Sequence, residues 1–288
     1  MPWVKVGDLR LHYESWGAAG SSAGMVLVHG LGSTCHIWDF TAPLLAERGL
    51  RVIAFDQRGH GESDQPDTGY DFPSVVADLV GFVDAVGLSE PSVLVGHSWG
   101  ASVVLHFAAA HRDRTAGIAL VDGGTSSPGE RWSWEETETR LRPPELDGMQ
   151  WTDLLQRMSS NDGAFPQSRA ELIGRSVFRV DSNGYVTRKF RISNHMQIVR
   201  AMWEQRPADL LAGMTCPVLL LPARRSTDTP DLAGAKAAGI ARAQTIQPTA
   251  RVRWFEETVH DVPLQRPEEL ADELVALASH ALASRAST

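Results

Sequence analysis

The chain has 288 residues, 43% of them hydrophobic and 22% charged, and it carries a formal net charge of −8 at pH 7. These values are ordinary for a globular protein, and an acidic balance without a basic run argues against a nucleic-acid partner. No apolar run reaches the length of a transmembrane helix, and the first residues show no apolar secretion core. Cys35 and Cys216 show no metal-ligand spacing. We therefore expect a cytoplasmic protein with reduced thiols and no metal, which binds neither nucleic acid nor a membrane.

The first third of the chain alternates between strand and helix patterns. Residues 4–16 alternate around Gly7-Asp8, which predicts two strands joined by a tight turn. Continuous apolar runs follow, of the kind that is buried on both faces of a parallel sheet, and a 3.6-residue period marks the helices between them. The predicted segments are strands at residues 25–28 and 51–55 and helices at residues 38–48 and 72–86.

The most informative stretch is residues 96–100, which read Gly-His-Ser-Trp-Gly. An apolar run at residues 92–95 precedes it, and a helical pattern rich in small residues follows it to about His111. Between a strand and a helix, Gly-x-Ser-x-Gly predicts a sharp turn that presents the serine hydroxyl at the helix N-terminus. The flanking glycines have no Cβ atom to collide with either element. This context indicates that Ser98 is a nucleophile; a tight turn with an ordinary serine is the alternative.

A long segment then interrupts the alternation. The strand predicted at residues 117–121 ends at Asp122, and from residue 125 to about 211 the sequence shows tryptophan-rich helical patterns without a buried strand run. The alternation resumes with strands at 217–221 and 251–255 and helices at 232–243 and 267–282. We therefore divide the chain into a first core part (1–124), a helical cap or lid (125–211) and a second core part (212–288).

Strands that alternate with helices predict βαβ units, and therefore an α/β fold whose mostly parallel sheet is covered on both faces. In such sheets, ligands bind beyond the carboxyl ends of the strands. His29, Asp56, Ser98 and Asp122 each follow a predicted strand. We therefore expect these residues to share one rim of the sheet, and the segment that begins there to cover it as a lid.

Taken together, these motifs resemble the α/β-hydrolase superfamily over nearly the whole chain. The resemblance rests on the His29-Gly30 loop, the Asp-x-Arg-Gly-x-Gly-x-Ser turn at residues 56–63, the elbow at Ser98 and the late His260, in that family's order and spacing. It implies an eight-stranded sheet, a cap inserted after the sixth strand, and a triad of serine, acid and histidine. Serine at the elbow separates the chain from the haloalkane dehalogenases and epoxide hydrolases of that family, which need aspartate there.

The base of the triad is assigned to His260. A serine hydroxyl is a weak nucleophile near neutral pH and needs a base to accept its proton. Among ten histidines, His260 lies in a loop after the last strand and before the terminal helix, which is the position of the family's histidine. We expect His97 to pack, and His29 and His60 to orient loops by hydrogen bonds.

The acid of the triad has two candidates. The family usually carries it shortly after the seventh strand, but here the first carboxylate after that strand, Asp228, comes late. Asp122 directly follows the sixth strand, where certain haloalkane dehalogenases place the acid, and a buried carboxylate at that rim needs partners. We favour Asp122 and keep Asp228 as the alternative. Asp56 is expected to brace its own turn through Arg58.

The resemblance also implies an oxyanion hole made by the backbone N–H groups of Leu31 and Trp99, which would stabilise developing negative charge. The sequence offers several residues that could line a substrate pocket: His29, Gly30, Trp38, Trp132, Trp134 and Trp203. The alternative for the lid tryptophans is that they form the lid's own small core.

These residues favour acyl transfer to water through an acyl-serine intermediate, a reaction that requires no cofactor. The expected partner is a small molecule with an apolar or aromatic acyl group, as a carboxylic ester, a lactone or a thioester. Hydrolysis of a carbon–carbon bond and a cofactor-free perhydrolase or haloperoxidase reaction are alternatives that use the same residues. A weakly catalytic receptor or signalling protein is the alternative of another class.

Overall fold

A computed structural model describes residues 2–18, 24–88, 91–159 and 166–286 of the chain. Its main sheet contains the strands β1 (Trp3–Val6), β2 (Leu9–Trp16), β3 (Gly24–Val28), β4 (Arg51–Phe55), β5 (Ser92–His97), β6 (Thr115–Val121), β9 (Val218–Leu221) and β11 (Arg251–Val252). The eight strands follow the order β1-β2-β4-β3-β5-β6-β9-β11. β2 pairs antiparallel with β1 and β4, and the remaining pairs are parallel. The predicted mostly parallel sheet is confirmed.

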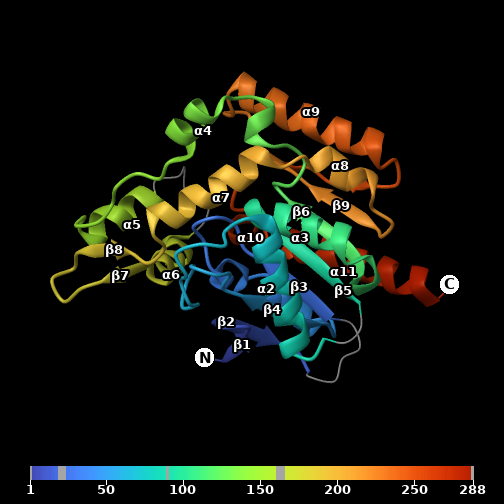
Figure 1. Cartoon of the computed structure of the whole chain (residues 1–288), viewed down its shortest axis with the longest axis horizontal. Helices are drawn as coiled ribbons and strands as arrows, with labels where there is room; N and C mark the ends of the chain where they lie inside the picture. Colours follow the sequence, from blue (N-terminus) through green and yellow to red (C-terminus); the bar gives the residue numbers. More distant parts are fainter. Residues whose placement is uncertain (1, 19–23, 89–90, 160–165, 287–288) are drawn as a thin grey trace.

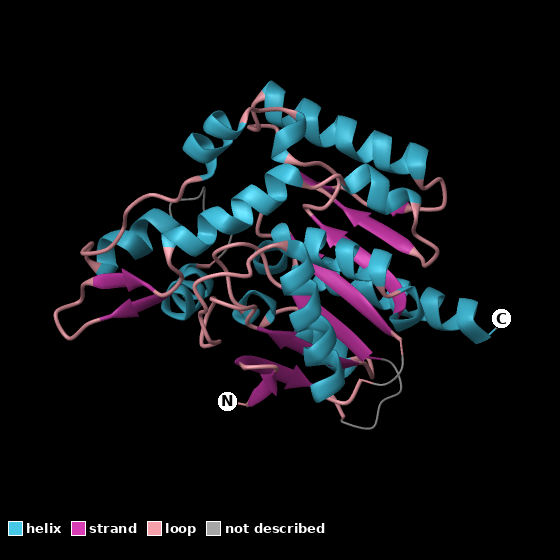
Figure 2. Cartoon of the chain, viewed as in Figure 1, coloured by secondary structure: helices cyan, strands magenta, loops and turns pink. Residues whose placement is uncertain are grey.

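Helices cover both faces of this sheet (Figures 1 and 2). They are η1 (Cys35–Trp38), α1 (Ala42–Glu47), α2 (Phe72–Ala85), α3 (Trp99–Ala110), η2 (Arg112–Arg114), α8 (Pro207–Ala212), α9 (Pro230–Ile246), α10 (Val262–Gln265) and α11 (Pro267–Ala286). Residues of α2, α3, α8 and α9 pack in one hydrophobic cluster, and residues of η1, α1, α10 and α11 pack in the other.

The need for helices on both faces follows from the strand sequences. Successive side chains of a strand point to opposite faces, and in β3 Met25 and Leu27 belong to one cluster while Val26 and Val28 belong to the other. All four side chains are buried. Burying such a side chain stabilises the fold by about 1.5–3 kcal/mol, so an uncovered face would lose one contribution of this size at every second residue.

The predicted helical insertion after the sixth strand is also present. It contains η3 (Pro128–Glu130), α4 (Trp134–Leu141), α5 (Trp151–Ser159), α6 (Gln167–Val177), β7 (Phe178–Val180), β8 (Val186–Arg188) and α7 (Ile192–Glu204). The antiparallel β7–β8 hairpin was not predicted. In Figure 1 the hairpin and α5 project to one side of the sheet, whereas α8, at the end of this segment, packs on α3 and α9.

Two further segments differ from the sequence prediction in detail. The helix predicted at 38–48 is divided into η1 and α1, because Pro43 lacks a backbone N–H and can lie in the first turn of a helix but not in its interior. The strand predicted at 251–255 leaves β9 after residue 253 and continues as β12 (Phe255–Glu256), which pairs with β10 (Ala223–Arg224).

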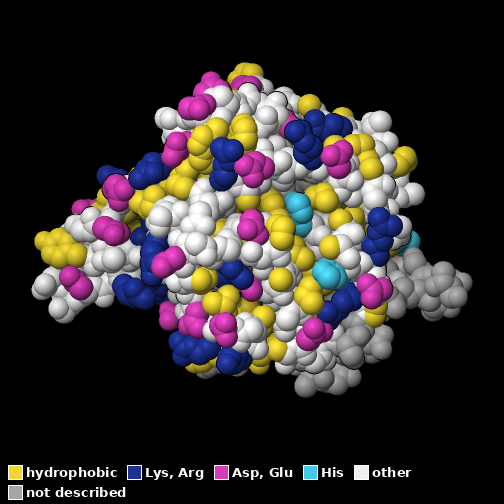
Figure 3. Space-filling view, in the orientation of Figure 1, with side chains coloured by type: hydrophobic (Ala, Val, Ile, Leu, Met, Phe, Trp, Pro, Cys, Tyr) yellow, Lys and Arg dark blue, Asp and Glu magenta, His cyan; other side chains and the backbone are white. Residues whose placement is uncertain are grey.

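The surface carries both signs of charge. On the face drawn in Figure 3, basic and acidic side chains are interspersed. Among the described residues, no helix combines the length and the apolar character that crossing a membrane requires.

Candidate active site

Ser98 lies in the turn between β5 and α3, with φ 55° and ψ −119°. Residues other than glycine rarely adopt this backbone conformation. Close backbone packing holds the turn, since a Cβ at Gly96 would lie 2.1 Å from the Gly100 carbonyl oxygen and one at Gly100 2.3 Å from that of Val28. The Ser98 N–H also donates to the Val121 carbonyl at 2.8 Å. The turn therefore fixes Ser98 at the N-cap of α3, beside the end of β6.

His260 and Asp122 meet at the same rim. The imidazole Nδ1 of His260 lies 2.6 Å from Oδ2 of Asp122 and donates to it. The Asp122 side chain is only 2% exposed, whereas the His260 side chain is 51% exposed. Within the described part of the chain, Nε2 of His260 makes no hydrogen bond, and it does not bond to Ser98 Oγ. The second ring nitrogen is therefore available to exchange a proton with another group.

The alternative acid, Asp228, is engaged elsewhere. Its Oδ2 accepts a hydrogen bond of 3.0 Å from the backbone N–H of Arg225, which closes a turn just before α9. The structure thus brings His260 together with Asp122 and not with Asp228.

The charges around the pair keep the carboxyl ionised and the ring basic. Burial disfavours the Asp122 carboxylate, but the hydrogen bond from His260 and the charges of His260 and Lys236 outweigh it and lower the pKa of Asp122 to about 2. Burial also disfavours the imidazolium, but the hydrogen bond and charge of Asp122, with a contribution from Asp261, raise the pKa of His260.

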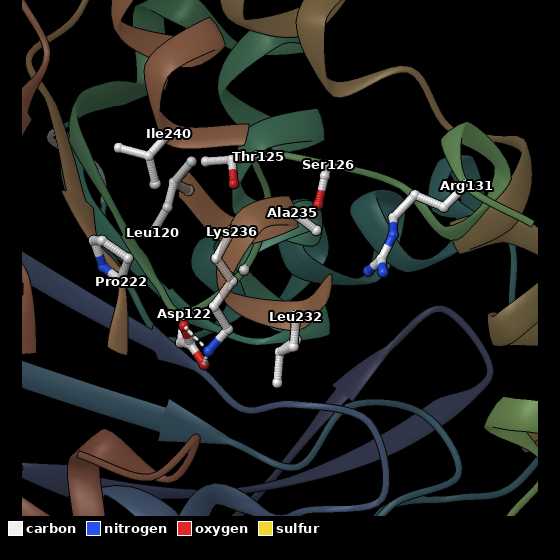
Figure 4. Close-up of a pocket in the computed structure, with 11 residues that line it drawn as sticks. Leu120, Asp122, Thr125, Ser126, Arg131, Pro222, Leu232, Ala235, Lys236 and Ile240 are labelled. Carbon is white, nitrogen blue, oxygen red and sulfur yellow. Dashed lines mark hydrogen bonds and ion pairs between the residues drawn. The ribbon is translucent and has the colours of Figure 1, made fainter. Parts of the chain in front are cut away.

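Lys236, on α9, is a member of this cluster that the sequence analysis did not identify. Its Nζ lies 2.9 Å from each carboxylate oxygen of Asp122 and 2.8 Å from the carbonyl oxygen of Ala223. The lysine is 114 residues from the aspartate in sequence, so no local motif indicates the contact. Figure 4 shows this ion pair at the edge of a cavity of about 180 Å³ between α9 and residues 122–131.

The loop after β3 is held by two buried histidines. His29 Nε2 accepts the backbone N–H of Gln57 at 3.0 Å, and its Nδ1 donates to the Gly30 carbonyl at 2.8 Å. His60 Nε2 accepts the Gly32 N–H at 3.2 Å. Burial lowers the pKa of both rings, which keeps each Nε2 as an acceptor. As expected, these histidines orient a loop by hydrogen bonds.

This loop lies against the turn that contains Ser98. A Cβ at Gly30 would be 3.0 Å from Ser98 Cβ, so the loop passes directly beside the serine. The backbone N–H groups of Leu31 and Trp99, the predicted oxyanion donors, donate no hydrogen bond within the described residues. Each of these N–H groups is therefore free to bind an acceptor.

His97 supports the loop that carries His260. Its Nε2 donates to the His260 carbonyl oxygen at 2.9 Å, and the two ring centroids are 4.8 Å apart. Burial and the neighbouring His260 lower the pKa of His97 to about 4, so its ring stays neutral beside His260. The packing role expected for His97 thus includes a direct hold on the backbone of His260.

Asp56 does brace its own turn, but the expectation that it acts through Arg58 was wrong. Arg58 instead pairs with Asp78, at 2.5 and 2.7 Å. The Asp56 carboxylate accepts hydrogen bonds of 2.8 to 3.0 Å from the His12 ring and from the backbone N–H groups of Cys35 and Glu62. Backbone N–H donors can stabilise a buried carboxylate without a cation. Asp56 therefore needs no ion pair with Arg58, which binds Asp78 instead.

One group of described residues, His12, Cys35 and Asp56, has potential metal-ligand atoms within 4.8 Å of one another. Both oxygens of the carboxylate already accept hydrogen bonds, and a Cβ at Gly61 would lie 2.1 Å from Oδ2. Burial also raises the pKa of the Cys35 thiol, which disfavours the thiolate that a metal requires. The group fits a packed hydrogen-bond network better than a metal site.

The tryptophans of the insertion contact one another. Trp203 Nε1 donates to the Trp132 carbonyl at 2.9 Å, and the Trp203 and Trp134 rings meet edge to face at 6.1 Å. The Arg200 guanidinium lies over both of these rings. These three tryptophan side chains are half-buried and form an aromatic cluster on the insertion, while Trp38 is fully buried in the main core. A substrate-lining role for these residues, and for His29 and Gly30, stays a prediction.

Comparisons with known proteins agree with this geometry. The model of the alpha/beta hydrolase family matches residues 25–273. Epoxide hydrolase A of Mycobacterium tuberculosis is 40% identical over 120 residues, which cover 41% of this chain and 37% of that protein. The non-heme haloperoxidase of Rhodococcus erythropolis is 38% identical over 112 residues, 38% of this chain and 39% of that protein. The matches thus span less than half the length of these relatives.

Solved structures match over a larger share of the chain. E-2-(acetamidomethylene)succinate hydrolase has a TM-score of 0.81 at 21% identity and covers 96% of this chain and 98% of its own. The enol-lactonase of Burkholderia xenovorans LB400 has a TM-score of 0.72 at 20% identity, over 96% of this chain and all of its own. At these identities, the similarity shows the fold alone.

Proposed function

This chain belongs to the α/β-hydrolase family, and we propose that it is a serine hydrolase that cleaves a small carboxylic ester or lactone. The observation that carries the proposal is the 2.6 Å contact between His260 and Asp122, at the rim where Ser98 caps α3. A buried carboxylate that orients a half-exposed imidazole is the arrangement that general-base activation of a serine requires.

In the proposed reaction, Ser98 Oγ attacks the acyl carbon while Nε2 of His260 accepts its proton. Asp122 holds the ring in the tautomer with the proton on Nδ1 and stabilises the imidazolium. The N–H groups of Leu31 and Trp99 bind the oxyanion. The imidazolium then protonates the departing alcohol, and a water molecule, deprotonated by the same ring, cleaves the acyl-serine to a carboxylic acid and free serine.

The serine nucleophile argues against transferring the epoxide hydrolase activity of some relatives to this chain. Attack by a serine hydroxyl on an epoxide carbon would give an ether, which has no acyl carbon for water to attack and would not turn over. Attack on an ester gives an acyl-serine, which water can cleave. Ser98 therefore supports acyl chemistry.

The similarity to non-heme haloperoxidases favours a second candidate reaction. Hydrogen peroxide would replace water at the acyl-serine, which gives a peracid and free Ser98 from the same intermediate. We further propose that the insertion, residues 125–211, is the cap that limits access to Ser98, because it starts directly after Asp122 and ends before β9.

The test is turnover of p-nitrophenyl acetate and butyrate and of a lactone panel, together with labelling by a fluorophosphonate probe. We expect the wild type to be labelled and to turn over, and Ser98→Ala to lose both. Ser102→Ala, which removes a buried hydroxyl one turn along α3, is the matched control and should keep the label. Absence of both labelling and turnover in the wild type would favour the receptor alternative. Peroxide-dependent peracid formation that exceeds hydrolysis would favour the second candidate.

A further inference from the structure

Lys236, on α9, forms an ion pair with Asp122, the residue that holds His260. The Lys236 ammonium group makes three contacts of 2.8 to 2.9 Å, two to the Asp122 carboxylate and one to the Ala223 carbonyl. An ammonium group has three N–H donors, so these contacts use all of them. The lysine therefore fastens α9 to the residues that follow β6 and β9.

From this arrangement we propose that Lys236 is a positioning residue for the catalytic pair: it orients the Asp122 carboxylate toward His260 and sets the pH at which His260 becomes a base. The inference rests on the proposed function of His260 and adds to it a residue outside the triad. Lys236 touches neither His260 nor Ser98 in the hydrogen bonds of the described residues, so it acts through Asp122.

The orienting effect follows from how the carboxylate oxygens are shared. Oδ1 of Asp122 accepts the Ala223 N–H at 3.0 Å and one Lys236 contact, while Oδ2 accepts the other Lys236 contact and the His260 ring. The carboxylate thus has donors on both oxygens and cannot rotate without breaking several bonds. The positive φ of Asp122, 44°, shows that its backbone is strained at the same point, so the side-chain contacts help to hold it.

The electrostatic effect follows from the charges that face the imidazole. Two carboxylates favour the imidazolium: Asp122, at the end of β6, and Asp261, the residue after His260. Lys236, from α9, disfavours the imidazolium. The His97 ring, from the end of β5, also faces the imidazole but stays neutral. Because the lysine compensates the charge of Asp122, it limits how basic His260 becomes. The ring then loses its proton at a lower pH than an uncompensated pair would allow.

The test is the pH dependence of kcat/KM for p-nitrophenyl acetate in Lys236→Met and Lys236→Gln. Removal of the cation should raise the acidic midpoint of the profile by about 1 pH unit, the size expected when a nearby charge is removed. At a pH below both midpoints, activity should then fall by about 10-fold relative to the wild type at the same pH. Lys236→Arg, which keeps the charge, should keep the midpoint close to that of the wild type.

Lys189→Met is the matched control. Lys189 is also paired, with Glu62 at 2.7 Å, and is 12% exposed, but it lies on the insertion and makes no contact with the pair, so its midpoint should not move. An unchanged midpoint in both Lys236→Met and Lys236→Gln would overturn the proposal, whatever happens to kcat or to stability.

A second measurement separates this proposal from the proposed function. In a Ser98→Ala background, an NMR titration of the His260 ring reports its pKa without any turnover. If Lys236→Met raises this pKa while the wild type, with Ser98 present, cleaves no ester, the positioning role stands and the hydrolase assignment fails. If the pKa does not move while the wild type is an active esterase, the positioning role fails alone.

Discussion

At the scale of single residues, the carboxyl groups of Asp122 and Asp228 should differ most in their effect on kcat. Asp122→Asn keeps the shape of the side chain but removes the charge that fixes the tautomer of His260, and kcat should fall by about 10,000-fold, as in other serine triads. Asp228→Asn alters a turn that does not contact His260 and should change kcat by less than about 3-fold. Steady-state kinetics with p-nitrophenyl butyrate compare the two, and a larger loss in Asp228→Asn would contradict the assignment of the acid.

His60 allows a test of the loop beside Ser98. Its ring stacks near Trp99 and Phe190, and its Nε2 accepts the Gly32 N–H. His60→Leu keeps an apolar side chain there but removes the acceptor, so the Leu31 amide would be held less firmly. We expect kcat to fall by about 10- to 100-fold, below the 100- to 1,000-fold cost of deleting an oxyanion donor outright. His111→Leu, at the far end of α3, is the control. A His60→Leu enzyme with wild-type kcat would show that the loop needs no such support.

At the scale of elements, the junction of β5 and α3 is the least tolerant point. Gly100→Ala would place a Cβ 2.3 Å from the Val28 carbonyl oxygen, and the two elements would have to separate. We expect a loss of at least about 3 kcal/mol in the free energy of unfolding, measured by urea denaturation.

Gly234→Ala on α9 is the matched control, because a Cβ there meets nothing within 4 Å. The higher helix propensity of alanine should stabilise this variant by about 0.5–1 kcal/mol. If the two substitutions changed the free energy of unfolding equally, the structure would have to accommodate the added Cβ at Gly100 by a backbone shift.

Some elements could be predicted from the sequence and others could not. The core strands were predictable because each is a continuous apolar run, and the Ser98 turn because glycines are needed on both sides of it. The β7–β8 hairpin was missed although Asn183-Gly184, a typical hairpin dipeptide, connects its strands, because those strands are only three residues long. Lys236 was not predictable, because its role depends on how α9 packs against the strand ends and not on any neighbour in sequence.

At the scale of the whole molecule, the insertion and the core are joined by buried polar contacts. Asn194 of α7 is 1% exposed and donates to the Tyr70 hydroxyl at 2.8 Å and to the Pro66 carbonyl at 3.1 Å. Asn194→Ala should lower the free energy of unfolding by about 1–3 kcal/mol, since it removes both of these hydrogen bonds from a buried position.

Because this joint links the two parts, tryptophan fluorescence and far-UV circular dichroism should still report one coincident transition in Asn194→Ala. Ser193→Ala, at an exposed position on the same helix, should change the free energy of unfolding by less than about 0.5 kcal/mol. A separate, earlier fluorescence transition would show that the insertion unfolds independently of the core.

The contact between His260 and Asp122 also has a consequence for folding. It joins residues that are 138 positions apart, with the insertion, β9, α9 and β11 between them. Contacts of such sequence separation form late, because the intervening chain must first be ordered. Regain of catalytic turnover during refolding should therefore mark the final docking of the C-terminal segment, after the secondary structure has already returned.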